Sequence, residues 1–416
     1  MPLRSQPLPW HVEPSYLSLD ITTTLFAMSE EIDRHVLRRY EAVQKLGKGA
    51  YGIVWKATDR KTDKTVALKK IFDAFQNATD AQRTFREVNF LFQMGGHENI
   101  VSLLSVLRAD NDRDLYLIFE YMETDLHATI RANILEEIHK QYIMYQAFKA
   151  LMYMHSAKLV HRDMKPANLL LNSDCLMKVA DFGLARSLLY SDVEPEDPKR
   201  DVLTDYVATR WYRAPEILLS SSTYGIEVDL WSLGCIFAEM IGGKPAFCGA
   251  STLNQIEKIV EHLGFPEEYT DPDAERILDS SFARKMLDSL NLPDNFPRVP
   301  KSIDQQKEAW RRMYPQAGED AIDLLASLLQ IDPRKRLKAT EGLTHPFCVQ
   351  FHDAQTETLA RDAVKVQSQQ IDSDNDKKYA LLKNVHLSLQ PSRGLTRLVP
   401  VAADQQQSIG TQYTRW

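Results

Sequence analysis

The pattern of apolar residues changes at about Tyr121, and this change constrains the fold more than any other feature of the chain. Before it, short β-like runs follow one another, with turn signals such as Thr62-Asp63-Lys64 between them. These runs cover residues 40–46, 52–59, 65–71 and 115–121. Beyond it, apolar residues recur at helical spacing. The sequence therefore predicts an α+β protein in which a β-rich lobe, residues 38–121, precedes an α-rich lobe, residues 122–350.

Helices are expected at several places. Within the β-rich lobe, residues 79–94 carry apolar side chains at helical spacing, and Thr79 and Asp80 would cap this helix. In the α-rich lobe one helical stripe is expected from Ile138, Tyr142, Tyr145, Phe148 and Met152. Further helices are expected at about 228–242, 252–264 and 319–330.

Composition narrows the classes of function. The 416 residues carry a net charge of −7, which gives no global attraction to a nucleic-acid backbone or an anionic membrane surface. Any phosphate binding must therefore be local, and we expect no nucleic-acid partner. No stretch reaches the roughly 18 apolar residues of a membrane span, and the N-terminus lacks the apolar run of a signal peptide. The four cysteines show neither CxxC nor zinc-ligand spacing, which favours a reducing compartment.

The two ends of the chain differ from the middle. Residues 1–37 are rich in Pro, Ser and Thr without sustained periodicity, so we expect an N-terminal extension. Residues 351–416 carry much Gln, Asp and Ser and few aromatics, so we expect a C-terminal tail that is partly ordered.

A glycine-rich stretch, Gly47-Lys48-Gly49-Ala50-Tyr51-Gly52-Ile53-Val54, lies between two expected strands. Its glycines would let the backbone approach and cover phosphates. The pattern alone is weak, because a glycine-containing hairpin without a ligand would look the same. A dinucleotide-binding fold would need a helix directly after the glycines. A second strand follows here instead, which favours a hairpin that acts as a lid.

Charged residues with chemical roles follow in order. Lys69, on the next expected strand, could clamp phosphates and pair with Glu87 on the expected helix, although a lone lysine on a strand is commonly just solvated. Asp163 could accept the proton of an attacking hydroxyl, while Asn168 and Asp181 could hold Mg²⁺ against the phosphates. Any one of these acids could instead cap a turn. Their order, each on the element type that its task requires, favours phosphoryl transfer.

Taken together, the motifs His161-Arg162-Asp163-Met164-Lys165-Pro166-Ala167-Asn168, Asp181-Phe182-Gly183 and Ala214-Pro215-Glu216 resemble those of eukaryotic protein kinases over about residues 38–350. The resemblance implies the two-lobed kinase fold, ATP and Mg²⁺ as cofactors, and an ion pair between Glu216 and Arg336. It implies Asp163, Lys165, Lys69 and Glu87 as catalytic residues. Lys165 is typical of serine/threonine kinases.

The same resemblance implies how ATP is held. Val54, Ala67 and Leu170 would sandwich adenine, whose polar edge would meet the backbone from Glu120 to Met122, with Phe119 closing the rear. The implied ATP-binding residues are Gly47, Lys48, Gly49, Ala50, Tyr51, Gly52, Val54, Ala67, Lys69, Phe119, Glu120, Tyr121, Met122 and Leu170.

Thr204-Asp205-Tyr206 is similar to the T-x-Y activation lip of MAP kinases, which implies phosphorylation of Thr204 and Tyr206. By the same resemblance Arg86, Arg162 and Arg186 would bind the first phosphate, and Arg210 and Arg213 the second. Alternatively these arginines bind the acidic loop residues Asp192, Glu194 and Glu196, which could occupy the site before phosphorylation.

Residues 69–87 and 108–126 resemble the atypical extracellular-signal-regulated kinases of the seven and eight type. Asp205 stands where that branch commonly has Glu, and the catalytic loop reads MKPAN where many relatives read QKPSN. The resemblance implies protein substrates with Ser/Thr-Pro sites, autophosphorylation, and a cytoplasmic location near cilia, centrosomes or secretory structures.

MAP kinases also use acidic residues after the last helix of the second lobe to bind basic docking peptides, and Asp353 and Glu357 fall at two of these places. Surface acids near a domain end are common without such a role. Two further alternatives stay open: a cyclin-dependent-type kinase, against which Tyr206 argues, and a catalytically silent scaffold with a kinase fold.

Overall fold

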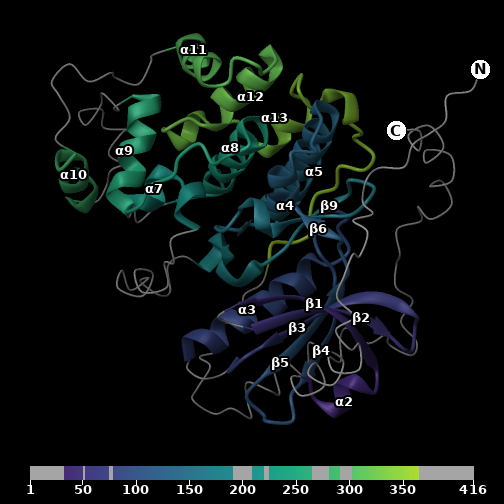
Figure 1. The fold of residues 1–416 in the computed structure, drawn as a ribbon. Helices are drawn as coiled ribbons and strands as arrows, with labels where there is room; N and C mark the ends of the chain where they lie inside the picture. The colour runs from purple at the N-terminus through teal and green to yellow at the C-terminus, as the bar shows by residue number, and fades with distance from the viewer. Residues whose placement is uncertain are drawn as a thin grey trace, which may run out of the picture.

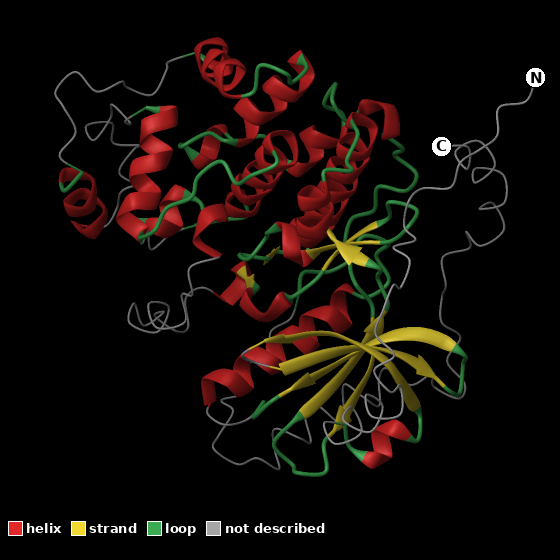
Figure 2. Ribbon diagram, viewed as in Figure 1, coloured by secondary structure: helices red, strands yellow, loops and turns green. Residues whose placement is uncertain are grey.

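The computed structural model describes residues 32–49, 52–74, 78–190, 209–219, 224–264, 281–290 and 302–364. It has a β-sheet lobe and a helical lobe, as Figures 1 and 2 show, and the predicted two-lobed α+β fold is confirmed. The expected N-terminal extension up to residue 31, Ala50, Tyr51, Thr204, Tyr206 and the tail beyond Val364 lie outside the described residues.

The first lobe is built on a five-stranded antiparallel sheet with strand order β1-β2-β3-β5-β4. Its strands are β1 Tyr40–Gly49, β2 Gly52–Asp59, β3 Lys64–Ile71, β4 Leu103–Arg108 and β5 Leu115–Glu120. Two helices accompany it, α2 Arg34–Leu37 and α3 Ala78–Met94. Because α3 begins at Ala78, Thr79 and Asp80 lie in its first turn, so the prediction that they cap the helix was wrong.

The two faces of this sheet have different surroundings. Along β2 and β3, residues alternate between buried and half-buried, as the two-residue period of a strand requires. The buried members, among them Trp55 and Leu68, pack with Val36 of α2 in a small separate core. The half-buried members, Val54, Ala67 and Lys69, therefore share the opposite face of the sheet.

The second lobe consists of helices and short strands. Its helices are α4 Leu126–Ala132, α5 Glu137–Ser156, α7 Pro215–Leu218, α8 Glu227–Gly242, α9 Thr252–Leu263, α10 Ser281–Asp288, α11 Ile303–Met313, α12 Glu319–Leu328 and α13 Ala339–Leu343. Its short strands are β6 Thr124–Asp125, β7 Leu159–Val160, β8 Leu169–Leu171, β9 Met177–Val179 and β10 Arg186–Ser187. The helices predicted at about 228–242, 252–264 and 319–330 are confirmed.

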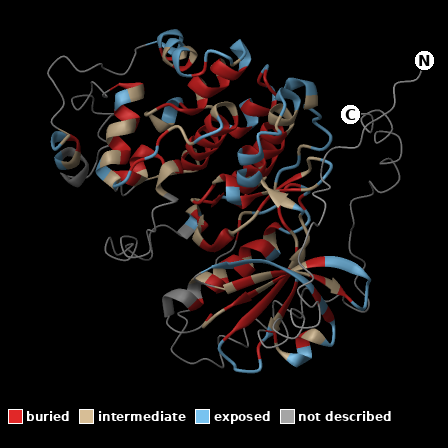
Figure 3. Ribbon diagram, in the orientation of Figure 1, coloured by how far each residue is buried: buried red, intermediate tan, exposed pale blue. Residues whose placement is uncertain are grey.

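Helices α5 and α8 form the centre of this lobe, and Figure 3 shows buried residues along both. From Ile143 to Met152, every residue of α5 is buried, so the helix has no single apolar stripe. Ile138 near its start is 43% exposed, and its place in the predicted stripe was wrong.

Residues 353–364, here called the C-terminal segment, run beside the end of α5. The backbone N–H of Ala360 donates to Ser156 Oγ at 2.9 Å. The N–H of Val364 donates to the Ala157 carbonyl at 2.8 Å, and its side chain joins the main core. The described residues of the predicted tail therefore pack against the helical lobe. Within the described ranges, no helix combines the length and the apolar character needed to cross a bilayer.

Candidate active site

Lys69 and Glu87 meet between the sheet and α3. The ammonium Nζ of Lys69 lies 2.8 Å from Glu87 Oε1, as the motif order predicted. Strand β3 places Lys69 opposite Val54 on one side and Leu117 on the other, on the half-buried face of the sheet. Burial alone would lower the pKa of Lys69, but the charges of Glu87 and Asp181 outweigh it and raise that pKa. The lysine is therefore held as a cation inside the site.

The segment between β7 and β8 carries a second cluster of polar groups. Asp163 Oδ2 accepts a hydrogen bond from Lys165 Nζ at 2.7 Å. The amide Nδ2 of Asn168 donates to the Asp163 carbonyl at 2.8 Å and lies 3.3 Å from Oδ2. The other carboxylate oxygen, Oδ1, is buried and has no hydrogen-bond partner among the described residues. Burial raises the pKa of the Asp163 carboxyl, and Lys165 opposes part of that rise.

Asp229 of α8 anchors the backbone of the segment between β7 and β8. Its carboxylate accepts the N–H groups of His161 at 2.9 Å and Arg162 at 2.8 Å. It also lies 3.0 Å from His155 Nε2. Arg162 has a φ of 69°, in the left-handed region that non-glycine residues rarely adopt, and the bond from its N–H to Asp229 fixes it there. The sequence alone did not reveal this anchoring role of Asp229.

Asp181 lies at the turn that follows β9. Its φ is 64°, and its Oδ1 accepts the N–H of Gly183 at 3.4 Å. Phe182, the next residue, is fully buried, with its ring 5.1 Å from that of His161. Burial alone would raise the pKa of Asp181, but the charges of Lys69, Lys165 and Arg83 hold it below its usual value. Asp181 is thus a half-buried carboxylate within the field of several cations.

Arg83 of α3 is a member of the site that the sequence did not reveal. A side-chain carbon placed on Gly183 would lie only 2.9 Å from Arg83 Nε, so the guanidinium covers this glycine closely. Arg83 also contributes to the lowered pKa of Asp181. A signal exists in the sequence, since Arg83 and Glu87 are four residues apart and share one face of a helix.

The glycine-rich stretch forms the hairpin that the sequence favoured over a helix. Gly47 pairs with Val54 and Gly49 with Gly52 across β1 and β2. A side chain at Gly52 would collide with the Lys70 carbonyl of β3, which explains that glycine. Gly47 and Gly49 have open space at their side-chain positions, so these two residues leave room around the hairpin.

The last strand of the sheet leads from Phe119 into the connection between the lobes. Phe119 lies between Ala67 and Leu103 of the neighbouring strands and is partly buried against the main core. The Glu120 carboxylate accepts the Ser102 N–H at 2.7 Å and pairs with Lys178 at 3.1 Å. The side chain of Glu120 is therefore occupied by the protein, and its backbone N–H donates to the Ser102 carbonyl at 3.1 Å.

Comparison with known proteins agrees with this geometry. A family model described as "Protein kinase domain" matches residues 40–348. The chain belongs to the protein kinase family. It is 60% identical over 338 residues to extracellular signal-regulated kinase 2 of Dictyostelium discoideum. The matched region covers 81% of this chain and 87% of the relative.

Two further relatives place this kinase among the MAP kinases. It is 49% identical to mitogen-activated protein kinase 15 of Caenorhabditis elegans over 80% of this chain and 67% of the relative. It is 47% identical to extracellular signal-regulated kinase 7 of Drosophila melanogaster over 79% of this chain and 34% of that longer relative. The predicted likeness to the seven and eight type of these kinases is confirmed, and the chain is a serine/threonine kinase of the MAP kinase family.

The arginines predicted to bind lip phosphates lie on several different elements of the kinase. Arg186 donates to the Ala185 carbonyl at 2.9 Å, and Arg210 donates to the Ala250 carbonyl at 3.2 Å. The Arg162 guanidinium lies 5.2 Å from the centre of the Tyr224 ring. Arg86 lies on α3, and Arg213 follows the turn Thr209–Tyr212. Thr204 and Tyr206 lie outside the described residues. The phosphate-binding role of the five arginines therefore stays a prediction.

The two predicted docking acids have different surroundings in the kinase. Asp353 is exposed. The Glu357 carboxylate is only 9% exposed and accepts the Tyr145 hydroxyl at 3.1 Å, with His352 Nδ1 2.7 Å away. Of the two, Asp353 is the more accessible to a basic peptide, although its Oδ1 accepts the Gln355 N–H at 3.0 Å.

Proposed function

We propose that this MAP kinase is ATP-dependent and proline-directed, and that it activates itself by phosphorylating Thr204 and Tyr206. The observation that carries the proposal is the assembled Lys69–Glu87 pair, at 2.8 Å, with Asp181 acting on the same lysine. A silent scaffold would not need a half-buried cation that pairs with one carboxylate and lies within the field of a second. This arrangement is the one that positions phosphates for transfer.

Asp163 is the residue that we assign to the attacking hydroxyl. Its carboxylate is the group that would orient a substrate Ser or Thr and take its proton. Lys165, bonded to the other oxygen, would stabilise the negative charge on the transferring group. Asp229 keeps the backbone of this segment in place through the His161 and Arg162 N–H groups.

The donor set suits Mg²⁺, which prefers carboxylate and carbonyl oxygens. Asp181 is ionised at neutral pH because its pKa is lowered. Asn168 uses its amide nitrogen on Asp163, so its carbonyl oxygen remains for a metal. Bound Mg²⁺ would neutralise charge on the phosphates, and Asp181 and Asn168 are the residues of this chain that would hold it.

For ATP itself we propose the half-buried face of the sheet. Val54, Ala67 and Leu170 would contact adenine, and the backbone from Glu120 to Met122 would bind its polar edge. The hairpin from Gly47 to Val54 would cover the phosphates. Apart from Ile53 of the hairpin, which is buried, the described residues among these are half-buried or exposed, as ligand-contacting positions require.

Self-phosphorylation of the lip is tested by expression in bacteria, which lack MAP kinase kinases. Mass spectrometry of the lip peptide should find phosphate on Thr204 and Tyr206 in the wild type and on neither in Asp163→Ala. An unmodified wild-type lip in a folded enzyme that binds ATP would show that a separate activating kinase is needed.

Substrate choice is tested with a pair of peptides that differ only in Ser-Pro against Ser-Ala. The proposal requires a higher kcat/KM for the Ser-Pro peptide, and equal values would overturn it. Location in the cytoplasm near cilia, centrosomes or secretory structures is a further proposal that rests on family resemblance alone. Fluorescence microscopy of the tagged chain, with a centrosome marker as reference, tests it.

A further inference from the structure

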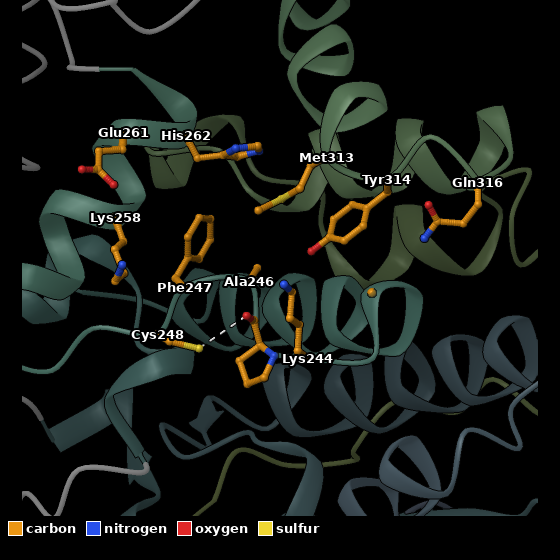
Figure 4. Close-up of a pocket in the computed structure, with 12 residues that line it drawn as sticks. Lys244, Ala246, Phe247, Cys248, Lys258, Glu261, His262, Met313, Tyr314 and Gln316 are labelled. Carbon is orange, nitrogen blue, oxygen red and sulfur yellow. Dashed lines mark hydrogen bonds between the residues drawn. The ribbon is translucent and has the colours of Figure 1, made fainter.

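Lys178 of β9 is a buried lysine to which the mechanism above gives no role. It is only 7% exposed. By contrast, Lys244, on the rim of the cavity between α8, α9 and α11, is exposed to water (Figure 4). A buried ammonium group is costly unless protein atoms replace the water that it loses. The atoms that bind Lys178 therefore indicate which parts of the kinase it holds together.

The ammonium group of Lys178 binds two separate parts of the chain. Its Nζ donates to the Glu98 carbonyl at 2.8 Å and lies 3.1 Å from Glu120 Oε1. The same carboxylate oxygen accepts the Ser102 N–H at 2.7 Å. The backbone N–H of Glu120 donates in turn to the Ser102 carbonyl at 3.1 Å. Both the side chain and the backbone of Glu120 are therefore fixed at the residue where β5 ends.

The Glu98 carbonyl lies in a loop that other contacts hold in place. This loop, residues 95–102, joins α3 to β4. The carbonyl of the next residue, Asn99, accepts the Val179 N–H at 2.9 Å, so the loop runs beside β9. The Glu98 carboxylate pairs with Lys149 of α5. Because the loop is bound on both sides, it gives the ammonium group a fixed anchor.

Strand β9 also brings Lys178 close to the place proposed for adenine. Lys178 pairs with Leu170 of β8, one of the proposed adenine contacts. Residues paired in an antiparallel ladder have Cα atoms only about 4.5 to 5.5 Å apart. Asp181, proposed to hold Mg²⁺, follows three residues after Lys178. Lys178 is therefore linked to the segment at residues 120–122, to Leu170 and to the Asp181 turn, which are all parts of the proposed ATP site.

We propose that Lys178 is a positioning residue for ATP binding. By holding the Glu120 carboxylate, it fixes the backbone of residues 120–122 in the orientation that the polar edge of adenine needs. This role rests on the proposed function, since it requires that adenine binds at this segment. A segment that is ordered before binding costs less free energy to order when the ligand arrives. Lys178 acts through Glu120 and not on the phosphates, so its loss should weaken ATP binding and leave the transfer step intact.

The test compares Lys178→Met with the wild type in steady-state kinetics. Methionine keeps an unbranched stem but removes the ammonium group. The KM for ATP should rise about three- to tenfold, as the loss of a charge-assisted contact predicts, while kcat and the KM for a Ser-Pro peptide stay within about twofold. A fluorescent ATP analogue should show the same loss in Kd. Mass spectrometry confirms that the lip of each protein carries the same phosphates.

Lys70→Met is the matched control. Lys70 of β3 is 8% exposed and pairs with Asp114 at 3.3 Å, so it too is a buried lysine with a carboxylate partner. Its ammonium group lies 5.3 Å from the centre of the Tyr116 ring, which belongs to the small core on the other face of the sheet. Lys70→Met should lower the free energy of unfolding without raising the KM for ATP. An unchanged KM for ATP in folded Lys178→Met, or an equal rise in both variants, overturns the positioning role.

A second variant tests the contact from the other partner. Glu120→Gln still accepts the Ser102 N–H but loses the charge that attracts Lys178. Because the Glu120 side chain is 29% exposed, this change does not disturb the core. The KM for ATP should rise in Glu120→Gln, and adding Lys178→Met should raise it little further, because both changes remove one contact. Fully additive rises overturn the proposal, and so does an unchanged KM in Glu120→Gln, which decides the question even where Lys178→Met does not fold.

Phe119→Gly separates this proposal from the assignment of the adenine site. Phe119 directly precedes Glu120 in β5. If Phe119→Gly gains the use of an ATP analogue enlarged at N6, adenine lies at this end of β5, and an unchanged KM in Lys178→Met then overturns the positioning role alone. If Phe119→Gly gains nothing, the adenine site lies elsewhere, and the assignment of the ATP site and the role of Lys178 are overturned together.

Discussion

The guanidinium of Arg336 meets the carboxylate of Glu216 in a buried two-pronged ion pair, with Nη1 2.5 Å from Oε1 and Nη2 2.7 Å from Oε2. Arg336 also donates through Nε to the Gln330 carbonyl at 2.8 Å. Its guanidinium lies 5.1 Å from the centre of the Trp231 ring. The pair joins Glu216 of α7, a short distance after the activation lip, to Arg336 in the connection between α12 and α13.

Removal of Arg336 should therefore destabilise the kinase strongly. Arg336→Met leaves the Glu216 carboxylate buried without its partner, which costs about 3 to 5 kcal/mol of unfolding free energy. Arg334→Met is the matched control, because Arg334 pairs with Asp332 at 2.9 Å while 47% exposed and should cost about 1 kcal/mol or less. Urea unfolding of both variants measures the difference. Equal losses would mean that burial of the pair does not decide its contribution.

Lys69→Met should lower phosphoryl transfer by about two or more orders of magnitude without unfolding the protein, because it removes a preorganised charge from the site. Asp181→Ala should have a similar effect for the same reason. Lys64→Met, at the exposed start of the same strand, is the control and should retain activity. Steady-state kinetics and circular dichroism test both parts. A folded Asp181→Ala enzyme with near wild-type turnover would contradict the mechanism.

Phe119→Gly should open space behind the place proposed for adenine. Phe119 stands in β5 opposite Ala67 and directly before Glu120, so loss of its ring enlarges the rear of the site. The variant should use an ATP analogue enlarged at N6 with a much higher kcat/KM than the wild type does. Tyr116 lies on the same strand but belongs to the small core on the other face of the sheet, so Tyr116→Phe should not gain this ability. An equal preference in Phe119→Gly and wild type would show that the adenine site lies elsewhere.

Asp229 should make the free energy of unfolding fall as the pH is lowered. Burial alone would raise the pKa of this carboxyl, but His155 and the backbone donors hold it below its unfolded value of about 3.9. The folded state therefore binds fewer protons, and the stabilisation is complete above the unfolded pKa and is lost as pH falls through the folded pKa. The difference in unfolding free energy between wild type and Asp229→Asn should be constant from about pH 7 to 5 and shrink below about pH 4. A difference that grows on acidification would refute this assignment.

The change in the pattern of apolar residues at Tyr121 allowed the two lobes to be predicted. The order of the motifs allowed the Lys69–Glu87 pair to be predicted, because each motif requires a particular type of element. Strand β4 was not predicted, since a register shift between Leu103 and Ser105 breaks its two-residue period and leaves Leu104 45% exposed. Arg83 was missed for another reason. Arg83 and Arg86 are chemically identical residues on one helix, and only the position of Gly183 shows which of them covers the Asp181 turn. The register of β4 and the choice between the two arginines therefore depend on contacts between residues far apart in the sequence, although the four-residue spacing of Arg83 and Glu87 gives a partial signal.

The C-terminal segment determines where a workable fragment of this kinase must end. The matched family range stops at residue 348, yet Val364 is 1% exposed, and its N–H is bonded to Ala157. Its carbonyl lies 3.5 Å from the hydroxyl of Ser187, four residues after Gly183. A truncation at the family boundary would empty a place in the main core and uncover the end of α5. The smallest unit suited to crystallography or screening therefore extends past Val364, and the same cut would alter the support of the segment that leads into the activation lip.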